Sequence, residues 1–493
     1  MNVTPVPLGH IPTLQATRRG ASTWCVKHGD EVLSWGELSR RANRRAHALT
    51  ARGVGRNDLV ILSLPNSAAL YELTFAIWKL GAVPSVVSWR LPLQEFRAIL
   101  EVARPKAVIV SDPAIAAAVD ALPVDFGLAE GRDDELDSVV GDHWKAMTSG
   151  GSTGRPKVIV DHAPGEVDLD TEVMLMPRDG TILNPGPCYH NAPFTMTHNA
   201  LFRGSAVVGM AKFDPEEALR LIDENRIGWV NFVPTMMNRI WRLPQEVRRR
   251  YDISCLQAVW HMAAPMPAWL KEHWIDWLGP EKIWEMYGGT ERQGLTIING
   301  VEWLQHRGSV GLPVACDIRI LDENGQELTH GEVGEIFLRP HSGAGSTYHY
   351  LGATPKAVGD GFETIGDFGS VDADGYLYLA DRRTDLILSG GANIYPAEVE
   401  GALLEHPGVE AAVVIGLPDE DMGAVTHAIV RRDPASDPVT PEALLAFLSE
   451  RLVRYKLPRS IEFTEEVLRD DAGKVRRGQL REARIARGRM EAV

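Results

Sequence analysis

Cysteine, net positive charge and long apolar runs are all scarce in this chain of 493 residues. The four cysteines, Cys25, Cys188, Cys255 and Cys316, lie far apart without a CxxC pair, which excludes a small domain stapled by disulfides. No run approaches the roughly 18 to 20 apolar residues that span a bilayer, and the start MNVTPVPLGH lacks the features of a signal peptide. We therefore expect reduced thiols, no membrane span and a cytoplasmic location.

Basic residues are outnumbered, with 51 Lys and Arg against 66 Asp and Glu and a net charge of −15. This balance argues against a protein that coats nucleic acid or an anionic membrane. With 46 Gly and 31 Pro the chain is neither collagen-like nor of low complexity, and 44% hydrophobic residues are typical of a globular protein. Its length is about three times that of a usual domain, so we expect two or more domains.

The N-terminal hundred residues alternate between helical and strand patterns. Ser34 to Glu37 form a capping box that opens a helix, and Asn66 is placed to cap the next one. We expect strands at 59–64, 83–87 and 106–110, separated by helices at 68–80 and 93–102. Strands separated by helices pair in parallel, which predicts an α/β fold with a doubly wound sheet.

The pattern changes after the midpoint. Segments 317–321, 334–339 and 375–379 have alternating or continuous apolar residues, and turn signals separate them. This pattern predicts antiparallel hairpins and a small β-barrel-like subdomain. Past residue 385 the chain returns to strands and helices over about 110 residues, enough for a mobile α+β domain. We place the boundary near Arg383, giving domains 1–383 and 384–493.

The segment TSGGSTGRPK, residues 148–157, has the composition of a phosphate-binding loop. Its glycines let backbone N–H groups converge on an anion, its hydroxyls can donate to phosphate oxygens, and Lys157 adds positive charge. It is neither a Walker loop nor the G-x-G-x-x-G pattern of dinucleotide sites. By itself, it is also compatible with a flexible Gly/Ser-rich turn.

Four further segments occur in the order and spacing of one known family. They are Met262-Ala-Ala-Pro265, Tyr287-Gly-Gly-Thr-Glu291, Gly366-Asp367 followed by Asp381-Arg382, and Gly473-Lys474. Together with the loop at 148–157, they resemble the motifs of the adenylate-forming superfamily, which includes acyl-CoA synthetases, adenylation domains of peptide synthetases and beetle luciferases. The resemblance covers essentially the whole chain.

The resemblance implies an ATP-dependent and Mg²⁺-dependent acid–thiol ligase that forms an acyl-adenylate and releases pyrophosphate. It implies that Lys474 meets the substrate carboxylate and the α-phosphate, that Thr290 and Glu291 act in catalysis, and that Glu291 binds Mg²⁺. The nucleotide-binding and cofactor-binding residues it implies are Thr148, Ser149, Gly150, Gly151, Ser152, Thr153, Gly154, Lys157, Ala263, Ala264, Pro265, Tyr287, Gly288, Gly289, Asp367, Arg382, Gly390 and Gly391.

Each residue also has a plainer explanation when it is taken alone. Glu291 could cap a helix, Asp367 could belong to a turn, and Lys474 could be one charge on a basic helix face. Their common order with the phosphate loop favours the functional interpretation. Gly150 departs from the Ser or Thr usual in the family, and Thr384 stands at the expected hinge where many relatives have Lys or Asp.

The acyl side of the site is indicated by Tyr189-His-Asn-Ala-Pro-Phe194. His190 matches the family position beside the acyl channel, and we expect it to act in catalysis. No aspartate lies between Tyr189 and His198 to pair with an amino acid's ammonium group, which favours an uncharged acyl tail. The segment looks most like bacterial ligases for bulky cyclic acids, such as bile-acid, steroid or terpenoid carboxylates. Candidate wall residues are Phe194, Trp229, Trp260 and His261.

The second substrate implied by the family is a thiol. Gly390 and Gly391 match a loop that lines the pantetheine tunnel after the small domain rotates, although a tight β-turn explains these glycines equally well. The chain ends soon after Lys474, so coenzyme A is the expected acceptor and a carrier-protein phosphopantetheine is the alternative. A luciferase-like oxygenase, a non-catalytic nucleotide sensor and a homodimer also stay open.

Overall fold

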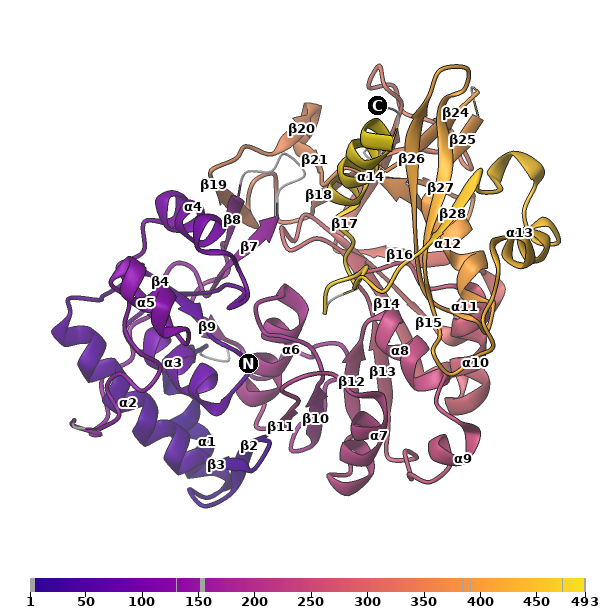
Figure 1. Cartoon of the computed structure of the whole chain (residues 1–493). Helices are drawn as coiled ribbons and strands as arrows, with labels where there is room; N and C mark the ends of the chain where they lie inside the picture. The colour runs from indigo at the N-terminus through magenta and orange to yellow at the C-terminus, as the bar shows by residue number, and fades with distance from the viewer. Residues whose placement is uncertain are drawn as a thin grey trace.

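The computed structural model describes residues 5–129, 131–150, 156–382, 385–390, 392–471 and 473–491. A large N-terminal part is built on two sheets flanked by helices, and a smaller C-terminal part lies at the right of Figure 1 in gold and yellow. Arg383 and Thr384 lie outside the described residues, so the division at that point stays a prediction. No described helix is both long enough and apolar enough to cross a membrane.

The first sheet has a parallel centre and an antiparallel edge. Strands β6, β4, β5 and β7 run parallel, and β8 and β19 follow in antiparallel pairing. The strands are β4 Leu59–Ser63, β5 Val83–Val86, β6 Ala107–Val110, β7 Ala146–Gly150, β8 Pro156–Asp161 and β19 Tyr348–Leu351. The helices of this region are α1 Ile11–Arg19, α2 Trp35–Ala51, α3 Ala68–Lys79, α4 Leu93–Ala103 and α5 Pro113–Val119.

The helix starts in this region show one confirmed prediction and one wrong one. Ser34 caps α2 in a reciprocal capping box with Glu37, as the sequence predicted. Asn66 does not cap α3, whose N-cap is Ser67. Instead the Asn66 side chain donates to the carbonyl of Gly186 at 2.8 Å and accepts from a backbone N–H in the same distant loop. A tertiary contact has taken the place of the local one.

The second sheet is longer and mixed. Its parallel centre consists of β2 Trp24–His28, β11 Ala206–Gly209, β10 Thr181–Asn184, β12 Trp229–Phe232, β13 Ala258–His261 and β14 Ile283–Gly288. β3 Glu31–Ser34 adds one antiparallel edge, and β15 Leu295–Asn299 and β16 Ser309–Val314 continue from β14. The helices of this region are α6 Asn191–Phe202, α7 Pro215–Glu224, α8 Pro234–Trp241, α9 Gln245–Arg248, α10 Ala268–Leu278 and α11 Gly300–Gln305. A short ladder joins β1 Val6–Pro7 to β9 Glu166–Val167.

The predicted hairpins after the midpoint are present. β17 Cys316–Leu321 pairs antiparallel with β18 Gly334–Pro340, and β22 Asp367–Val371 pairs with β23 Leu377–Arg382. β20 Lys356–Val358 and β21 Phe362–Thr364 complete this subdomain. Its described strands continue the second sheet through the pairing of β16 with β23, so they form an open extension of that sheet.

The second sheet is apolar on both faces. On β12, Trp229 faces a core that includes α6 and the first sheet, whereas Val230 faces a core formed with α7, α8 and α10. Successive residues of a strand point to opposite faces, and a parallel sheet covered on both sides is apolar on both. The alternation therefore identifies which residues of β12 and β13 lie on the α6 side.

The C-terminal part is an α+β unit with its own core. Its sheet contains β24 Ile387–Ser389, β25 Ala392–Ile394, β26 Val409–Asp419, β27 Gly423–Arg432 and β28 Ser460–Phe463. Its helices are α12 Pro396–Leu404, α13 Pro441–Ser449 and α14 Arg477–Glu491.

Arg242, the residue after α8, joins the two parts. Its Nη1 atom donates to the carbonyl of Pro407 at 2.9 Å and to the carboxylate of Asp433 at 3.1 Å. Its Nη2 atom donates to the carbonyl of Leu404, the last residue of α12, at 3.1 Å. Carbonyls at a helix C-terminus carry partial negative charge and favour a cation. The guanidinium therefore holds the small part against α8.

Candidate active site

The predicted phosphate loop connects two antiparallel strands. Thr148, Ser149 and Gly150 end β7, and Lys157 lies near the start of β8, where its backbone pairs with Ser149. Gly151, Ser152, Thr153 and Gly154 lie outside the described residues. The loop itself and the phosphate contacts of its residues therefore stay a prediction.

Lys157 and Glu291 meet beside this loop. The Nζ atom of Lys157 lies 3.2 Å from Oε1 of Glu291, and both hydrogen-bond the hydroxyl of Tyr350 on β19, at 3.0 Å from Lys157 and 2.7 Å from Glu291. Burial and the Glu291 charge raise the pKa of Tyr350, so its hydroxyl remains a donor at neutral pH. The structure thus brings the phosphate loop and the Tyr-Gly-x-Thr-Glu segment together.

Tyr350 is not among the residues expected from the sequence. The residue belongs to no motif, and it reaches Glu291 because β19 pairs with β8, with Tyr350 opposite Ile159. A pairing between segments almost 200 positions apart leaves no periodic signal in a single sequence. Thr290 is half-buried in the loop after β14, directly before the buried Glu291.

Tyr287 and Asp367 form a second polar pair. The hydroxyl of Tyr287, on β14, donates to Oδ2 of Asp367, on β22, at 2.9 Å. Arg382 lies opposite Asp367 in the ladder between β22 and β23. The two residues expected to bind ribose are therefore neighbours, and the tyrosine expected beside adenine contacts one of them. Gly288 and Gly289 follow Tyr287 toward Glu291.

The segment Ala263 to Pro265 follows β13 at the carboxyl end of the parallel strands. Ala263 has φ 73°, a left-handed conformation that is unfavourable for residues with a Cβ atom. Such strained backbone persists where surrounding structure enforces it, often at ligand sites. Ligands of open α/β sheets bind outside the carboxyl ends of the strands, which is the position of this segment.

The loop that carries Lys474 reaches this segment from the small part. Gly473 has φ 76°, and a Cβ atom there would lie 3.3 Å from Oγ1 of Thr235 and 3.8 Å from Cβ of Ala264. Asp471 in the same loop pairs with Arg90 of the large part at 2.5 Å. The lysine loop therefore packs against the expected adenine-binding segment.

His190 lies at the N-cap of α6 and close to the lysine loop. Burial, together with the nearby charge of Lys474, lowers the pKa of His190 to about 3, so the imidazole is neutral near pH 7. Its buried Nε2 atom has no hydrogen-bond partner among the described residues. A neutral imidazole that faces the lysine loop can contact a substrate without carrying charge.

Lys145, which sequence analysis also missed, holds the first turn of α6. Its buried Nζ atom donates to the side chains of Asn191 and Thr195, the latter at 2.8 Å, and lies 3.8 Å from Asp161. Burial lowers the pKa of Lys145 to about 8. A lysine directly before β7 thus links the phosphate-loop strand to the helix that begins beside His190.

The four expected wall residues do not share one face. Phe194, Trp229 and Trp260 belong to the core on the α6 side of the second sheet. His261 is fully buried on the opposite side, with Nε2 3.7 Å from the carboxylate of Glu285. His261 therefore cannot line one wall together with the other three, because one residue along a strand reverses the face.

Gly390 lies at the turn between β24 and β25, with φ 56° and a backbone hydrogen bond to Met422 at 2.9 Å. This hairpin lies at the outer edge of the small part in Figure 1, apart from the lysine loop. Gly391 lies outside the described residues. In this arrangement the lysine loop faces the large part and the glycine hairpin does not.

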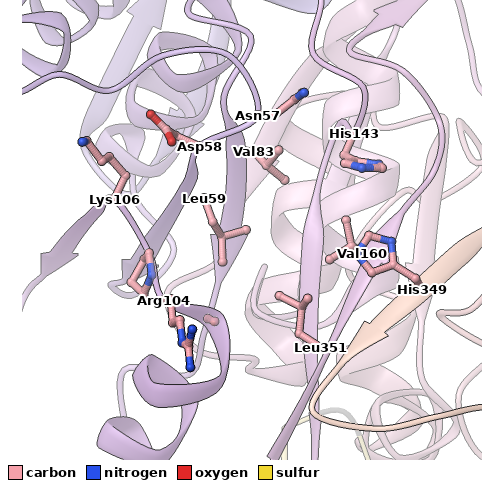
Figure 2. Close-up of a pocket in the computed structure, with 12 residues that line it drawn as sticks. Asn57, Asp58, Leu59, Val83, Arg104, Lys106, His143, Val160, His349 and Leu351 are labelled. Carbon is pink, nitrogen blue, oxygen red and sulfur yellow. The ribbon is translucent and has the colours of Figure 1, made fainter.

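A hollow of 460 Å³ opens elsewhere, over the first sheet. Figure 2 shows His143, Val160 and His349 on one side of it, with Arg104 and Lys106 across the opening. None of the residues expected to act on ATP lines this hollow. We therefore place the candidate active site where the motif residues come together, and not at this hollow.

Comparisons with known proteins agree with this site. The model of the AMP-binding enzyme family matches residues 13–349, and that of the AMP-binding enzyme C-terminal domain matches residues 398–474. The chain is 35% identical to a feruloyl-CoA synthase from Amycolatopsis sp, covering 96% of this chain and 98% of the relative. It is 31% identical to the long-chain-fatty-acid–CoA ligase FadD13 of Mycobacterium tuberculosis, covering 92% and 93%. The crystal structure of ATP-bound MatB from Rhodopseudomonas palustris superposes with a TM-score of 0.78 at 25% identity, covering 97% and 99%.

The fold and the site define an adenylate-forming enzyme. The chain belongs to the AMP-binding enzyme family, and within it to the acyl-CoA ligases. The predicted α/β class and the family resemblance are thus confirmed.

Proposed function

We propose that this protein activates a bulky or cyclic carboxylic acid with ATP and transfers the acyl group to coenzyme A. In the first step a carboxylate oxygen attacks the α-phosphorus, forming the acyl-adenylate and releasing pyrophosphate. In the second step a thiolate attacks the acyl carbon and AMP leaves. The contact of the lysine loop with Ala264, beside His190, is the observation that carries this proposal.

We assign adenylation to the lysine loop and the Lys157 cluster. Lys474 stabilises negative charge on the α-phosphate and orients the carboxylate, while Lys157 and Thr290 act on the phosphate side. Asp367 accepts hydrogen bonds from the ribose with Arg382 beside it, and Tyr287 fixes the Asp367 carboxylate. Residues 148–154 bind the triphosphate, and Ala263 to Pro265 and Gly288 to Gly289 border the adenine.

Glu291 is suited to hold Mg²⁺. Its Oε1 atom already accepts hydrogen bonds from Lys157 and Tyr350, whereas its Oε2 atom has none among the described residues. Mg²⁺ prefers carboxylate and phosphate oxygens. The ion would neutralise charge on the phosphate groups, and the Lys157 to Tyr350 cluster keeps the carboxylate in place for it.

The proposal of a cyclic acid is supported by aromatic residues on the α6 side of the second sheet. Trp229, Trp260 and Phe194 supply large apolar surfaces, and Trp260 stacks on Trp284 with ring centroids 5.3 Å apart. Flat aromatic walls suit a ring. A relative at 35% identity is named a feruloyl-CoA synthase, which agrees with a cyclic acid.

The thiol step requires a second arrangement of the small part. With the lysine loop against Ala264, the turn at Gly390 lies away from it, so we propose that the small part turns about Thr384 to bring the loop of Gly390 and Gly391 to the thiol. Adenylate formation and thioester formation then alternate by rotation at a short hinge. The domain boundary, a homodimer and the cytoplasmic location remain predictions.

A pyrophosphate-release screen over a panel of carboxylic acids tests the proposal. Each acid is assayed alone, with coenzyme A and with a phosphopantetheinylated carrier protein. We expect pyrophosphate release with cyclic acids and a thioester product with coenzyme A. Absence of pyrophosphate with every acid would exclude the ligase, and a thioester formed on the carrier protein alone would establish the alternative acceptor.

A further inference from the structure

Two buried polar groups on the α6 side of the second sheet lack hydrogen-bond partners. The Oδ1 atom of Asn231 and the Nε1 atom of Trp260 are both inaccessible and unpaired among the described residues. Asn231 is 9% exposed and Trp260 is 1% exposed. Leaving such a group unsatisfied is unfavourable, so buried unpaired atoms need an explanation.

The two residues are direct neighbours in the sheet. Asn231 on β12 pairs in register with Trp260 on β13, and each is the third of four residues in its strand. Both lie one residue before the carboxyl end of a parallel strand. After Trp260 and His261, the chain enters the Met262 to Pro265 segment that borders the nucleotide.

Both side chains lie on the α6 side of the second sheet, where we place the acyl site. Trp229 and Trp260 belong to the core that also contains Phe194 of α6, and Asn231 shares the face of Trp229 because it lies two residues further along β12. Helix α6 packs against β12 and begins beside His190. The unpaired groups therefore lie between the second sheet and α6, near the start of that helix.

The two groups have opposite roles in hydrogen bonding. The amide oxygen of Asn231 only accepts a hydrogen bond, and the indole N–H of Trp260 only donates one. A hydroxyl can do both, because it donates through its hydrogen and accepts through its oxygen. A charged group is disfavoured here, since neither residue supplies a counter-charge.

We propose that Asn231 and Trp260 recognise a hydroxyl group on the ring of the substrate, an inference that rests on the proposed function. The substrate class is then a hydroxylated cyclic carboxylic acid. Asn231 accepts the hydroxyl hydrogen, and Trp260 donates to the hydroxyl oxygen or to an ether oxygen beside it. A site built around such bonds rejects the deoxy analogue, because binding that analogue leaves both buried groups unpaired.

The test compares acids that differ only in the hydroxyl. Cinnamic acid is assayed against its 2-, 3- and 4-hydroxy derivatives, and 5β-cholanic acid against hydroxylated cholanic acids, with pyrophosphate release as the readout. We expect at least one hydroxylated acid to exceed its deoxy partner in kcat/KM by about 30-fold or more. Equal kcat/KM values within every pair would overturn the proposal.

Variants assign the preference to the two residues. Asn231→Leu removes the acceptor at similar size, and we expect the hydroxyl preference to fall to within about threefold of unity while turnover of the deoxy acid is kept or improved. Trp260→Phe removes the N–H and keeps an aromatic ring, and we expect a partial loss of preference. Retained preference in both variants contradicts the assignment.

Trp229→Phe is the matched control. Trp229 lies on the same face, but its Nε1 atom already donates to the carbonyl of Met174 at 2.8 Å. We expect Trp229→Phe to change overall turnover without changing the hydroxyl preference. A loss of preference in this control would assign the effect to packing. The outcomes separate two failures, because absence of pyrophosphate with all acids rejects the ligase function, whereas turnover without hydroxyl preference rejects only the hydroxyl site.

Discussion

Lys157 and Glu291 form an ion pair at 3.2 Å that Tyr350 completes by hydrogen-bonding both partners. The lysine comes from the strand after the phosphate loop, the glutamate from the loop after β14, and the tyrosine from a strand at the edge of the first sheet. One oxygen of the carboxylate is thereby fixed, and the other accepts no hydrogen bond from the described residues. In the proposed site, these three distant segments would together position one ligand for Mg²⁺.

Tyr350→Phe is therefore expected to weaken the positioning of Glu291. A hydrogen bond to a charged group contributes about 1.5–3 kcal/mol, which corresponds to roughly a 10- to 100-fold effect. We expect kcat/KM for pyrophosphate release to fall within this range and the Mg²⁺ concentration for half-maximal rate to rise. Tyr378→Phe, which removes a hydroxyl bonded to Asp372 in a hairpin, is the control and should leave both values near those of the parent. An unchanged Mg²⁺ dependence in Tyr350→Phe would contradict the role of the tyrosine.

Lys474→Ala is expected to reduce acyl-adenylate formation by a factor on the order of 10² or more, because it removes a cation that stabilises developing phosphoryl charge. Thioester formation from supplied acyl-adenylate and coenzyme A should largely survive. Both half-reactions are measured separately, by pyrophosphate release and by acyl-CoA production. Lys456→Ala, which removes a lysine paired with Glu398 in the same part, is the control. Equal losses in the two half-reactions of Lys474→Ala would show that the lysine is not specific to adenylation.

Arg242→Ala is expected to release the small part from α8. The substitution removes bonds to Leu404, Pro407 and Asp433, so the arrangement with the lysine loop at Ala264 becomes less populated. We expect adenylation to fall about tenfold while thioester formation from supplied acyl-adenylate is unchanged or faster. Arg239→Ala, an exposed residue of the same helix, should behave like the parent. A slower thioester step in Arg242→Ala would argue against two alternating arrangements.

Thr384→Pro tests the hinge from the opposite direction. Proline fixes φ near −65° and removes a backbone donor, which restricts rotation of the small part. If the proline holds the arrangement seen here, adenylation should persist while thioester formation from supplied acyl-adenylate falls steeply. The two half-reactions are compared in folded protein, verified by circular dichroism. Parent rates in both steps would place the hinge at another residue.

Three buried histidines predict loss of stability in acid. Burial lowers the pKa of His198 to about 3, and it lowers the pKa of His190 to about 3 and of His261 to about 4. An unfolded histidine has a pKa near 6.5, so below that pH the unfolded chain binds protons that the folded chain does not. Stability should therefore decrease as pH falls from about 6.5 toward 4, by about 1.4 kcal/mol per pH unit for each histidine.

His198→Gln isolates one of these contributions. The variant keeps a side chain able to donate to the carbonyl of Phe194, which His198 contacts at 2.7 Å, but it cannot be protonated. We expect the slope of unfolding free energy against pH between 6 and 4.5 to become shallower by about 1.4 kcal/mol per unit. Urea titrations followed by tryptophan fluorescence measure this slope. The exposed His330→Gln is the control, and an unchanged slope in His198→Gln would contradict the prediction.

Local patterns in the sequence determined a large share of this protein. Some signals act over only a few residues, so their outcome does not depend on residues far away in the chain. They include the capping box at Ser34, the apolar runs of β4 to β6 and the turn signals around β17 and β18. The motif order from residue 148 to Lys474 likewise identified the family. Both kinds of signal depend on residue type and spacing, which a single sequence records in full.

Tertiary structure alone decided which side chains meet. Asn66 left its predicted cap for the loop at Gly186, His261 took the face opposite to Trp260, and Tyr350 joined Glu291 through strand pairing. The pairing of Asn231 with Trp260 also depends on the register of two strands. Register and face are set by packing among elements far apart in the chain, and a shift of one residue reverses a strand's faces. That long-range packing is the physical reason the sequence predicted the chemistry of the site but not all of the residues that build it.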